Sequence, residues 1–366
     1  MNKQYNPNRL KVARLRRKMT LKCLSECIGM SSKMVSAYEN ETSKYIPTFE
    51  TLMDMASALG YPIEFFYGDD IESLDASTVS FRSLKSMKAA DQHAAIAAGQ
   101  LGFLLSEFFS DKFSLPKQDI PDFRGFEPEV AAEAIREHWG LGNKSIKNVV
   151  HLLEAKGVRV FSLSENTADV DAFSFWKDSI PFVFLNTKKS GERSRFDAAH
   201  ELGHLLLHRH GSVVGRDAES EADNFASAFL MPRTSVFEMA PGFATTKSLI
   251  KIKGCWLVSL MALIVRMKNL GLLTEWQYRS LLVEATGLGY RTGEPNGIDR
   301  ERSLLFDKLL PALKANGIDI PEISRLLNLP TEEVSALLFR PTAVSIRNDI
   351  KIPSYRESKP KLTLVK

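Results

Sequence analysis

The first seventy residues place apolar positions at helical spacing in short runs separated by turn and capping residues. Thr20 can cap a second helix, which Gly29 ends in a left-handed turn. Ser31 or Ser32 can cap a third helix, and two more are expected, one over 48–60 and one directly after it. The pattern predicts five short helices in one bundle, with a tight turn between the second and the third.

The following segment, residues 71–125, combines the composition of a linker with one long helical pattern. It begins with several acidic residues and ends in a stretch punctuated by Pro116 and Pro121. Between 84 and 113, apolar residues recur at helical spacing. We expect this helix to pack against the next domain and not to stand free as a coiled coil.

Alternating and short apolar runs, which are typical of strands, appear only in the middle of the chain. They predict strands at 157–163, 171–176 and 181–186. Helical patterns precede them at 131–139 and 147–155, and helical patterns follow them. The chain is therefore expected to adopt a mainly α fold with a small β-sheet, an α+β architecture.

These patterns divide the chain into five parts. They are the five-helix bundle (1–70), a linker with a long helix (71–125), a central α+β domain (126–290), a helical C-terminal domain (291–350) and a disordered tail (351–366). The run "ISRLLNLPTEEVSALLF" has the spacing of a second helix-turn-helix. A helical interaction domain is the preferred interpretation of that region.

Composition limits where the protein can act. The chain has 366 residues, 44% of them hydrophobic, and only three cysteines, which argues against a secreted disulfide framework and for a reducing compartment. The charged N-terminus shows no signal-peptide pattern. The longest nearly apolar run, 256–265, is about half the roughly 20 residues that span a bilayer. We expect a cytoplasmic protein with no membrane partner.

Positive charge is concentrated at the N-terminus. Eight basic residues precede the first acidic residue, Glu26: Lys3, Arg9, Lys11, Arg14, Arg16, Arg17, Lys18 and Lys22. Such a cluster is typical of a nucleic-acid surface, although a solvated helix face has the same composition.

The run "LKVARLRRKMTLKCLSECIGMSSKMVSAYENE", continued by "LMDMASALGYPIEFFYG", resembles the Cro/C1-type, or XRE, helix-turn-helix family over residues 7–68. The resemblance implies that the third helix enters the major groove of an operator in double-stranded DNA. Its base-facing residues would be Ser32, Lys33, Ser36 and Ala37. Phosphate contacts would come from Arg9, Lys22 and Lys44. Two-fold operators would favour a homodimer. A bundle that docks a protein is the alternative.

The sequence "HELGH" carries the strongest chemical signal in the chain. His200 and His204 are four residues apart, so on one helix they share a face and can bind one zinc ion. Glu201 projects beside the metal, as a general base must. Glu219 and Glu221 compete as the third ligand. A closed structural zinc site is the alternative, but a glutamate beside the first histidine has no purpose there.

Residues from about 130 to 290 resemble the ImmA/IrrE family of zinc metallopeptidases. The shared pieces are HELGH, a further "LH", the pattern E-x-x-A-(N/D)-x-F-A and "LMP". The resemblance implies a gluzincin-like endopeptidase with His200, His204 and Glu219 as ligands and Glu201 as general base. Asp223, which stands where asparagine is commoner, is expected to bond a ligand histidine. His208 is expected to point away from the metal.

Together the motifs suggest a transcriptional regulator whose zinc endopeptidase domain cuts a repressor or an antitoxin-like protein. An edge strand near 182–185 could pair with the extended substrate above the zinc. In one alternative, the zinc domain of a transcription regulator or antitoxin senses or binds without cutting. In another, a plain peptidase carries a protein-docking head.

Overall fold

The computed structural model describes residues 4–75, 79–81, 88–163, 172–209, 216–291 and 293–340. Within these ranges the chain forms sixteen α-helices, one 3-10 helix and a four-stranded sheet, which confirms the predicted mainly α fold with a small sheet. None of the described helices is both long and apolar enough to cross a membrane. The expected tail, 351–366, lies outside the described residues.

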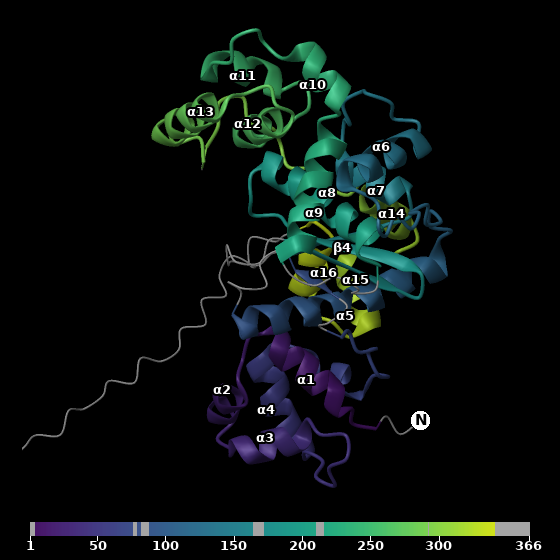
Figure 1. The fold of residues 1–366 in the computed structure, drawn as a ribbon. Helices are drawn as coiled ribbons and strands as arrows, with labels where there is room; N and C mark the ends of the chain where they lie inside the picture. The colour runs from purple at the N-terminus through teal and green to yellow at the C-terminus, as the bar shows by residue number, and fades with distance from the viewer. Residues whose placement is uncertain are drawn as a thin grey trace, which may run out of the picture.

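The N-terminal bundle, which we call the head, lies at one end of the molecule (Figure 1). Its elements are α1 (Pro7–Arg16), α2 (Leu21–Cys27), α3 (Ser32–Tyr38), α4 (Phe49–Leu59) and the 3-10 helix η1 (Ile63–Tyr67). The side chains of Thr20, Ser31 and Thr48 each accept a hydrogen bond from a backbone N–H in the first turn that follows. The five predicted helices are therefore present.

The sheet has the strand order β1-β3-β4-β2. Its strands are β1 (Ser80–Phe81), β2 (Arg159–Leu163), β3 (Ala172–Lys177) and β4 (Ile180–Asn186). β3 and β4 form an antiparallel hairpin whose two turn residues, Asp178 and Ser179, have φ of 48° and 64°, as the tight primed turns of hairpins require. β2 joins β4 in parallel, and β1 joins β3 antiparallel.

The prediction that residues 182–185 lie in an edge strand is wrong. These residues belong to β4, which lies inside the sheet and pairs with β2 on one side and β3 on the other. Its backbone groups are already used in the sheet, so β4 cannot receive an extended peptide. The outer edge of the hairpin belongs to β3.

The long helix α5 (Ala89–Lys112) covers one face of the sheet, and α8 (Gly191–Leu207) covers the other. Side chains along β3 alternate accordingly. Phe175 packs on Phe103 of α5, while Ser174 reaches toward α8. A Cβ atom at Gly102 would lie 2.6 Å from the ring of Phe184, so α5 can approach the sheet only because this residue is glycine.

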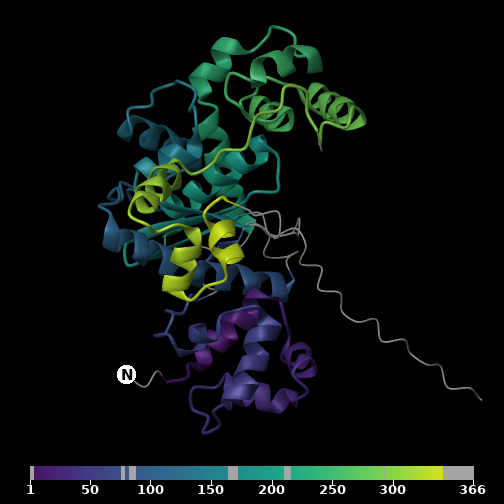
Figure 2. The same cartoon turned by 180° about the vertical axis from the view of Figure 1, so that it is seen from behind.

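The other helices of the body surround this sandwich or extend from it. They are α6 (Pro128–His138), α7 (Val149–Ala155), α9 (Arg216–Leu230), α10 (Arg233–Met239), α11 (Thr246–Lys253), α12 (Leu260–Asn269), α13 (Glu275–Gly287), α14 (Leu304–Ala315), α15 (Ile320–Leu327) and α16 (Thr331–Leu337). Helices α10–α13 lie at the end opposite the head, whereas α14–α16 return to the body (Figure 2). Residues 333–337 of α16 are buried, so this helix is not available as a second DNA reader.

The head is fastened to the body by ion pairs that start from α1. Glu333 on α16 binds Arg16 at 2.5 Å and Arg17 at 3.3 Å, and the side chains of Arg16 and Glu333 are only 7% and 3% exposed. Just after α1, Lys18 pairs with Asp91 on α5 at 2.7 Å. Two helices that are far apart in sequence, α5 and α16, therefore hold the head against the body.

Candidate metal centre and nucleic-acid interface

Helix α8 is anchored firmly before it reaches the histidines. Ser190 caps its first turn, and Arg195 bonds the buried carboxylate of Glu301 and the backbone oxygen of Ile146. The same carboxylate accepts hydrogen bonds from the first two backbone N–H groups of α7. This network fixes α8 relative to α7 and to the chain that precedes α14.

Helix α9 crosses close to α8 because the contact is made by small residues. A Cβ atom at Gly203 would lie 3.0 Å from the ring of Phe225 and 3.2 Å from the backbone of Ala222. A larger residue at either position would push the helices apart. The glycine of HELGH and the alanine of the E-x-x-A pattern therefore bring the carboxylates of α9 to the histidines of α8.

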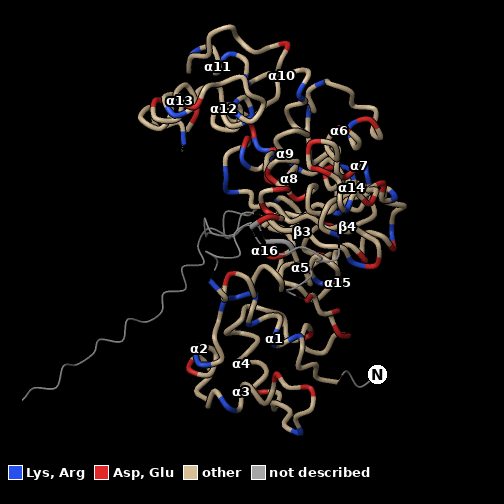
Figure 3. The backbone as a smooth tube through the Cα atoms, in the orientation of Figure 1, with Lys and Arg blue, Asp and Glu red and all other residues tan. Residues whose placement is uncertain are grey.

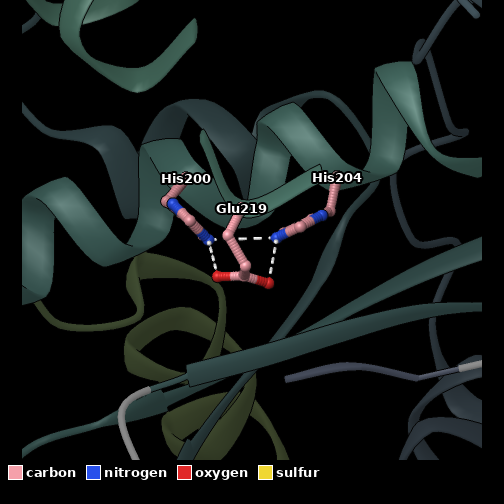
Figure 4. Close-up of side chains that lie close together, drawn as sticks. All are labelled: His200, His204 and Glu219. Atoms are coloured by element: carbon pink, nitrogen blue, oxygen red, sulfur yellow. Dashed lines mark hydrogen bonds and ion pairs between the residues drawn. The ribbon is translucent and has the colours of Figure 1, made fainter. Parts of the chain in front are cut away.

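Three side chains converge between these helices (Figure 4). The Nε2 atoms of His200 and His204 lie 3.0 Å apart, and the two carboxylate oxygens of Glu219 lie one against each histidine, Oε2 at 3.4 Å from His200 and Oε1 at 3.4 Å from His204. A tetrahedral zinc ion with bonds of about 2.0–2.1 Å separates its ligand atoms by roughly 3.3 Å. These three residues therefore have the spacing and the donor chemistry to hold such an ion.

Hydrogen bonds at the Nδ1 atoms of His200 and His204 orient the two rings. Asp223 accepts a bond from His200, with 2.9 Å between Oδ1 and Nδ1, as expected from the sequence. Nδ1 of His204 lies 2.9 Å from Nδ1 of His208, whose Nε2 lies 2.7 Å from a carboxylate oxygen of Glu221. If Nε2 of His204 binds a metal, its Nδ1 carries the proton, so the hydrogen bonds run from His204 through His208 to Glu221.

This second chain of contacts was missed by the sequence reasoning. His208 was expected to point away from the metal, as a buried histidine bonded to backbone or as a substrate contact, and Glu221 was considered only as a rival ligand. The signal was present in the further four-residue step from His204 to His208, which keeps the third imidazole within reach of the second.

Glu201 is buried on the side of α8 that faces the sheet. It is 0% exposed, and its Oε2 accepts a hydrogen bond of 2.6 Å from the hydroxyl of Ser174 on β3. Its Oε1 is also buried and has no hydrogen-bond partner among the described residues. Burial raises the pKa of Glu201 to about 8, so its carboxylate is a stronger base than that of an exposed glutamate.

The ligand candidates have the protonation states that zinc needs. Burial lowers the pKa of His204 to about 4, which keeps the imidazole neutral near pH 7. Burial by itself raises the pKa of Glu219, but hydrogen bonds from His200 and His204 outweigh it and lower the pKa to about 2. A neutral imidazole beside an ionised carboxylate is a suitable donor set for a divalent cation.

A metal-binding experiment can distinguish the role of Glu219 from that of Glu221. Glu221→Gln should lower zinc affinity by about 10–100-fold, which is typical for loss of a partner behind a ligand. Glu219→Gln should lower it further, because a direct ligand is replaced. Competition with a chromogenic chelator measures both. A larger loss in the Glu221 variant would contradict the assignment of Glu219 as the ligand.

In the head, most of the N-terminal basic residues are engaged inside the protein. Arg14 pairs with Glu39, and Arg16, Arg17 and Lys18 hold the body. Arg9 is 6% exposed, and its guanidinium donates to the backbone oxygens of Phe65 and Asp69. The expected phosphate contact by Arg9 is therefore corrected, since its donors face the interior of the head.

The recognition-helix candidate, α3, remains accessible at the end of the head away from the body (Figure 3). Lys33 and Ser36 are exposed, and Ser32 and Ala37 are half-buried. The hydroxyl of Ser32 lies 2.9 Å from that of Ser25, which ties α3 to α2. Lys22 and Lys44 are exposed beside this helix pair. All predicted contacts except Arg9 thus remain available to DNA.

Comparison with known families agrees with this division. Residues 10–66 match the model of a helix-turn-helix family, and residues 153–268 match that of a peptidase family described as the IrrE N-terminal-like domain. No curated protein matches the chain. The chain therefore joins a helix-turn-helix domain to an IrrE-like domain.

Proposed function

We propose that this fusion of a helix-turn-helix domain with an IrrE-like domain is a DNA-binding transcriptional regulator that carries a zinc-dependent endopeptidase. One observation carries the proposal. His200, His204 and Glu219 converge at metal-ligand spacing while Glu201 lies buried on the same helix. A purely structural zinc site does not need that glutamate.

The residues around the centre fit peptide hydrolysis. A zinc ion bound there would act as a Lewis acid and would lower the pKa of its water to about 7. Because the hydroxyl of Ser174 occupies Oε2 of Glu201, Oε1 is the atom that accepts the proton from the attacking water. Glu201 then passes that proton to the nitrogen of the leaving amine.

The substrate class we propose is a repressor or an antitoxin-like protein. The reason is the fusion itself, since a head that binds an operator brings the peptidase to proteins bound at the same place. This role requires the compartment that holds the DNA, which is the cytoplasm.

The proposal is tested on DNA-regulatory proteins encoded beside the gene. Each is incubated with the zinc-loaded protein, and fragments are identified by intact mass. Cleavage should stop when a chelator removes zinc and should return when zinc is restored. If no candidate is cut while both zinc and DNA are bound, a regulator without proteolysis becomes the better description. The complete burial of His200 and Glu201 is the observation that favours this alternative.

DNA recognition gives a separate prediction. Lys33→Ala should weaken binding to an operator selected from a random duplex library by about 1–3 kcal/mol and relax its base preference, because lysine can donate to guanine O6 and N7. Lys22→Ala should instead weaken binding to all sequences and reduce the salt dependence. Lys11, exposed on α1 away from α3, supplies the matched control. Equal effects of Lys33→Ala and Lys11→Ala would exclude base contact by Lys33.

We also propose that two copies bind adjacent half-sites. Four large apolar side chains lie exposed in the loop between α3 and α4 and on the first turns of α4: Tyr45, Ile46, Phe49 and Met53. Several exposed apolar side chains in the segment that follows the recognition helix favour contact with a second head.

A further inference from the structure

The outer edge of β3 is covered by the linker that leaves the head. The carboxylate of Glu72 pairs with Lys177 at the far end of β3 at 2.5 Å. Leu74 and Phe175 both lie against Gly99 of α5. Ser80 then pairs with Ser174, and Phe81 with Phe173, in antiparallel register. In the described parts of the linker, 72–75 and 79–81, the order of these contacts is opposite to the direction of β3.

This edge lies directly beside the candidate catalytic base. Ser174 pairs with Ser80 through its backbone, and its hydroxyl bonds Oε2 of Glu201. Paired residues in antiparallel strands have Cα atoms about 4.5–5.5 Å apart. The backbone of β1 thus lies next to Ser174, the β3 residue that contacts Glu201.

An exposed strand edge binds extended peptides through backbone hydrogen bonds. Only one segment can pair with a given edge at a time, and β3 is the edge closest to Glu201. We propose that residues 79–81 occupy, within the same chain, the position that an extended peptide substrate needs. The linker is then a built-in competitor of the peptidase, an inference that rests on the proposed function.

Residues 79–81 are attached weakly enough for a peptide substrate to displace them from β3. The side chain of Val79 is 5% exposed and holds the segment in place. The ladder has only two residue pairs, whereas β3 has six residues, so a longer peptide can form more backbone bonds. The ion pair of Glu72 is open to solvent, since that side chain is 61% exposed.

The test measures peptide binding in a chain that cannot cut. Full-length protein with Glu201→Gln is titrated with a fluorescent synthetic peptide of residues 75–86. Adding Val79→Asp, which places a charge at a buried position, should raise the affinity about tenfold, as expected when a closed site becomes mostly open. Adding Ser73→Asp, which places the same charge on an exposed linker residue, should leave it unchanged.

Val79→Asp is one release variant, a substitution expected to free β3 from residues 79–81. A second release variant keeps the test valid if Val79→Asp misfolds. Glu72→Lys changes an exposed residue and should raise affinity at least about twofold, because it sets two like charges together at Lys177. Hydrogen exchange should also become faster, in both release variants, at the one amide of the pair 173 and 174 that faces β1, while the other amide, which faces β4, keeps its protection. Unchanged affinity in both would overturn the proposal.

Two further outcomes separate this proposal from the proposed function. If otherwise wild-type protein cuts its substrate at the same rate with and without Val79→Asp, the competitor is excluded and the peptidase stands. If the release variants bind the peptide more tightly but cut nothing, the competitor stands and the peptidase fails. Fragments ending at Ser80 would also overturn the proposal, because the linker would then be a substrate.

Discussion

Glu201→Gln is expected to lower the rate of peptide hydrolysis by about 10²–10⁴-fold while the protein keeps its zinc. The amide has nearly the size of the carboxylate and can still accept the hydrogen bond from Ser174, so the fold around α8 should not change. It cannot take a proton from water, and no other described carboxylate combines complete burial with a place beside His200. Parallel measurements of cleavage rate and zinc content by atomic absorption check this result.

The matched control is Glu137→Gln, which removes a carboxylate charge from an exposed position on α6. It should leave both the rate and the zinc content unchanged. Retention of full activity in the Glu201 variant would assign the base elsewhere. Loss of zinc together with activity would make Glu201 part of the metal site itself.

Glu333→Ala should destabilise the contact between head and body by about 3–5 kcal/mol, because it removes the buried carboxylate that the guanidinium of Arg16 binds. Glu333→Ala also removes the carboxylate that pairs with Arg17, whose guanidinium lies over the buried ring of Tyr61. Chemical denaturation followed by circular dichroism measures the change. The neighbouring Glu332→Ala, at an exposed position, should stay within about 0.5 kcal/mol of wild type.

A double variant identifies the cause of that loss. Arg16→Met with Glu333→Leu replaces the ion pair by apolar side chains of similar volume. This double variant should recover most of the stability, because no charged group is then buried without a partner of opposite charge at these two positions. If the double variant is as unstable as Glu333→Ala, the loss comes from packing. If Glu333→Ala behaves like Glu332→Ala, the ion pair does not hold the head.

Features set by local chemistry were predicted well from the sequence. Thr20 and Thr48 cap helices because their hydroxyls need only the N–H groups of the following turn. His200 and His204 meet because four residues make about one helical turn. The choice of Glu219 over Glu221 as a metal ligand stays a prediction, and it rests on a neighbour one turn further, Ala222, whose size lets the helices approach.

Features set by distant partners could not be predicted. A basic cluster in the sequence says nothing of which acids will face it, and Glu333 lies more than 300 residues from Arg16. The position of β4 inside the sheet depends on strand order, which no local pattern records. β1 has two residues, too few for any periodicity.

The attachment of α1 to α5 and α16 has a thermodynamic consequence for the two ligands of the chain. DNA at α3 and a peptide at β3 act on one continuous scaffold, joined by the linker that leaves η1. If DNA changes the affinity for peptide by some factor, linkage requires that peptide change the affinity for DNA by the same factor. Titrating each ligand in the presence of the other therefore measures one coupling free energy in two independent ways, and a factor of one in both titrations would show that the two sites are not coupled.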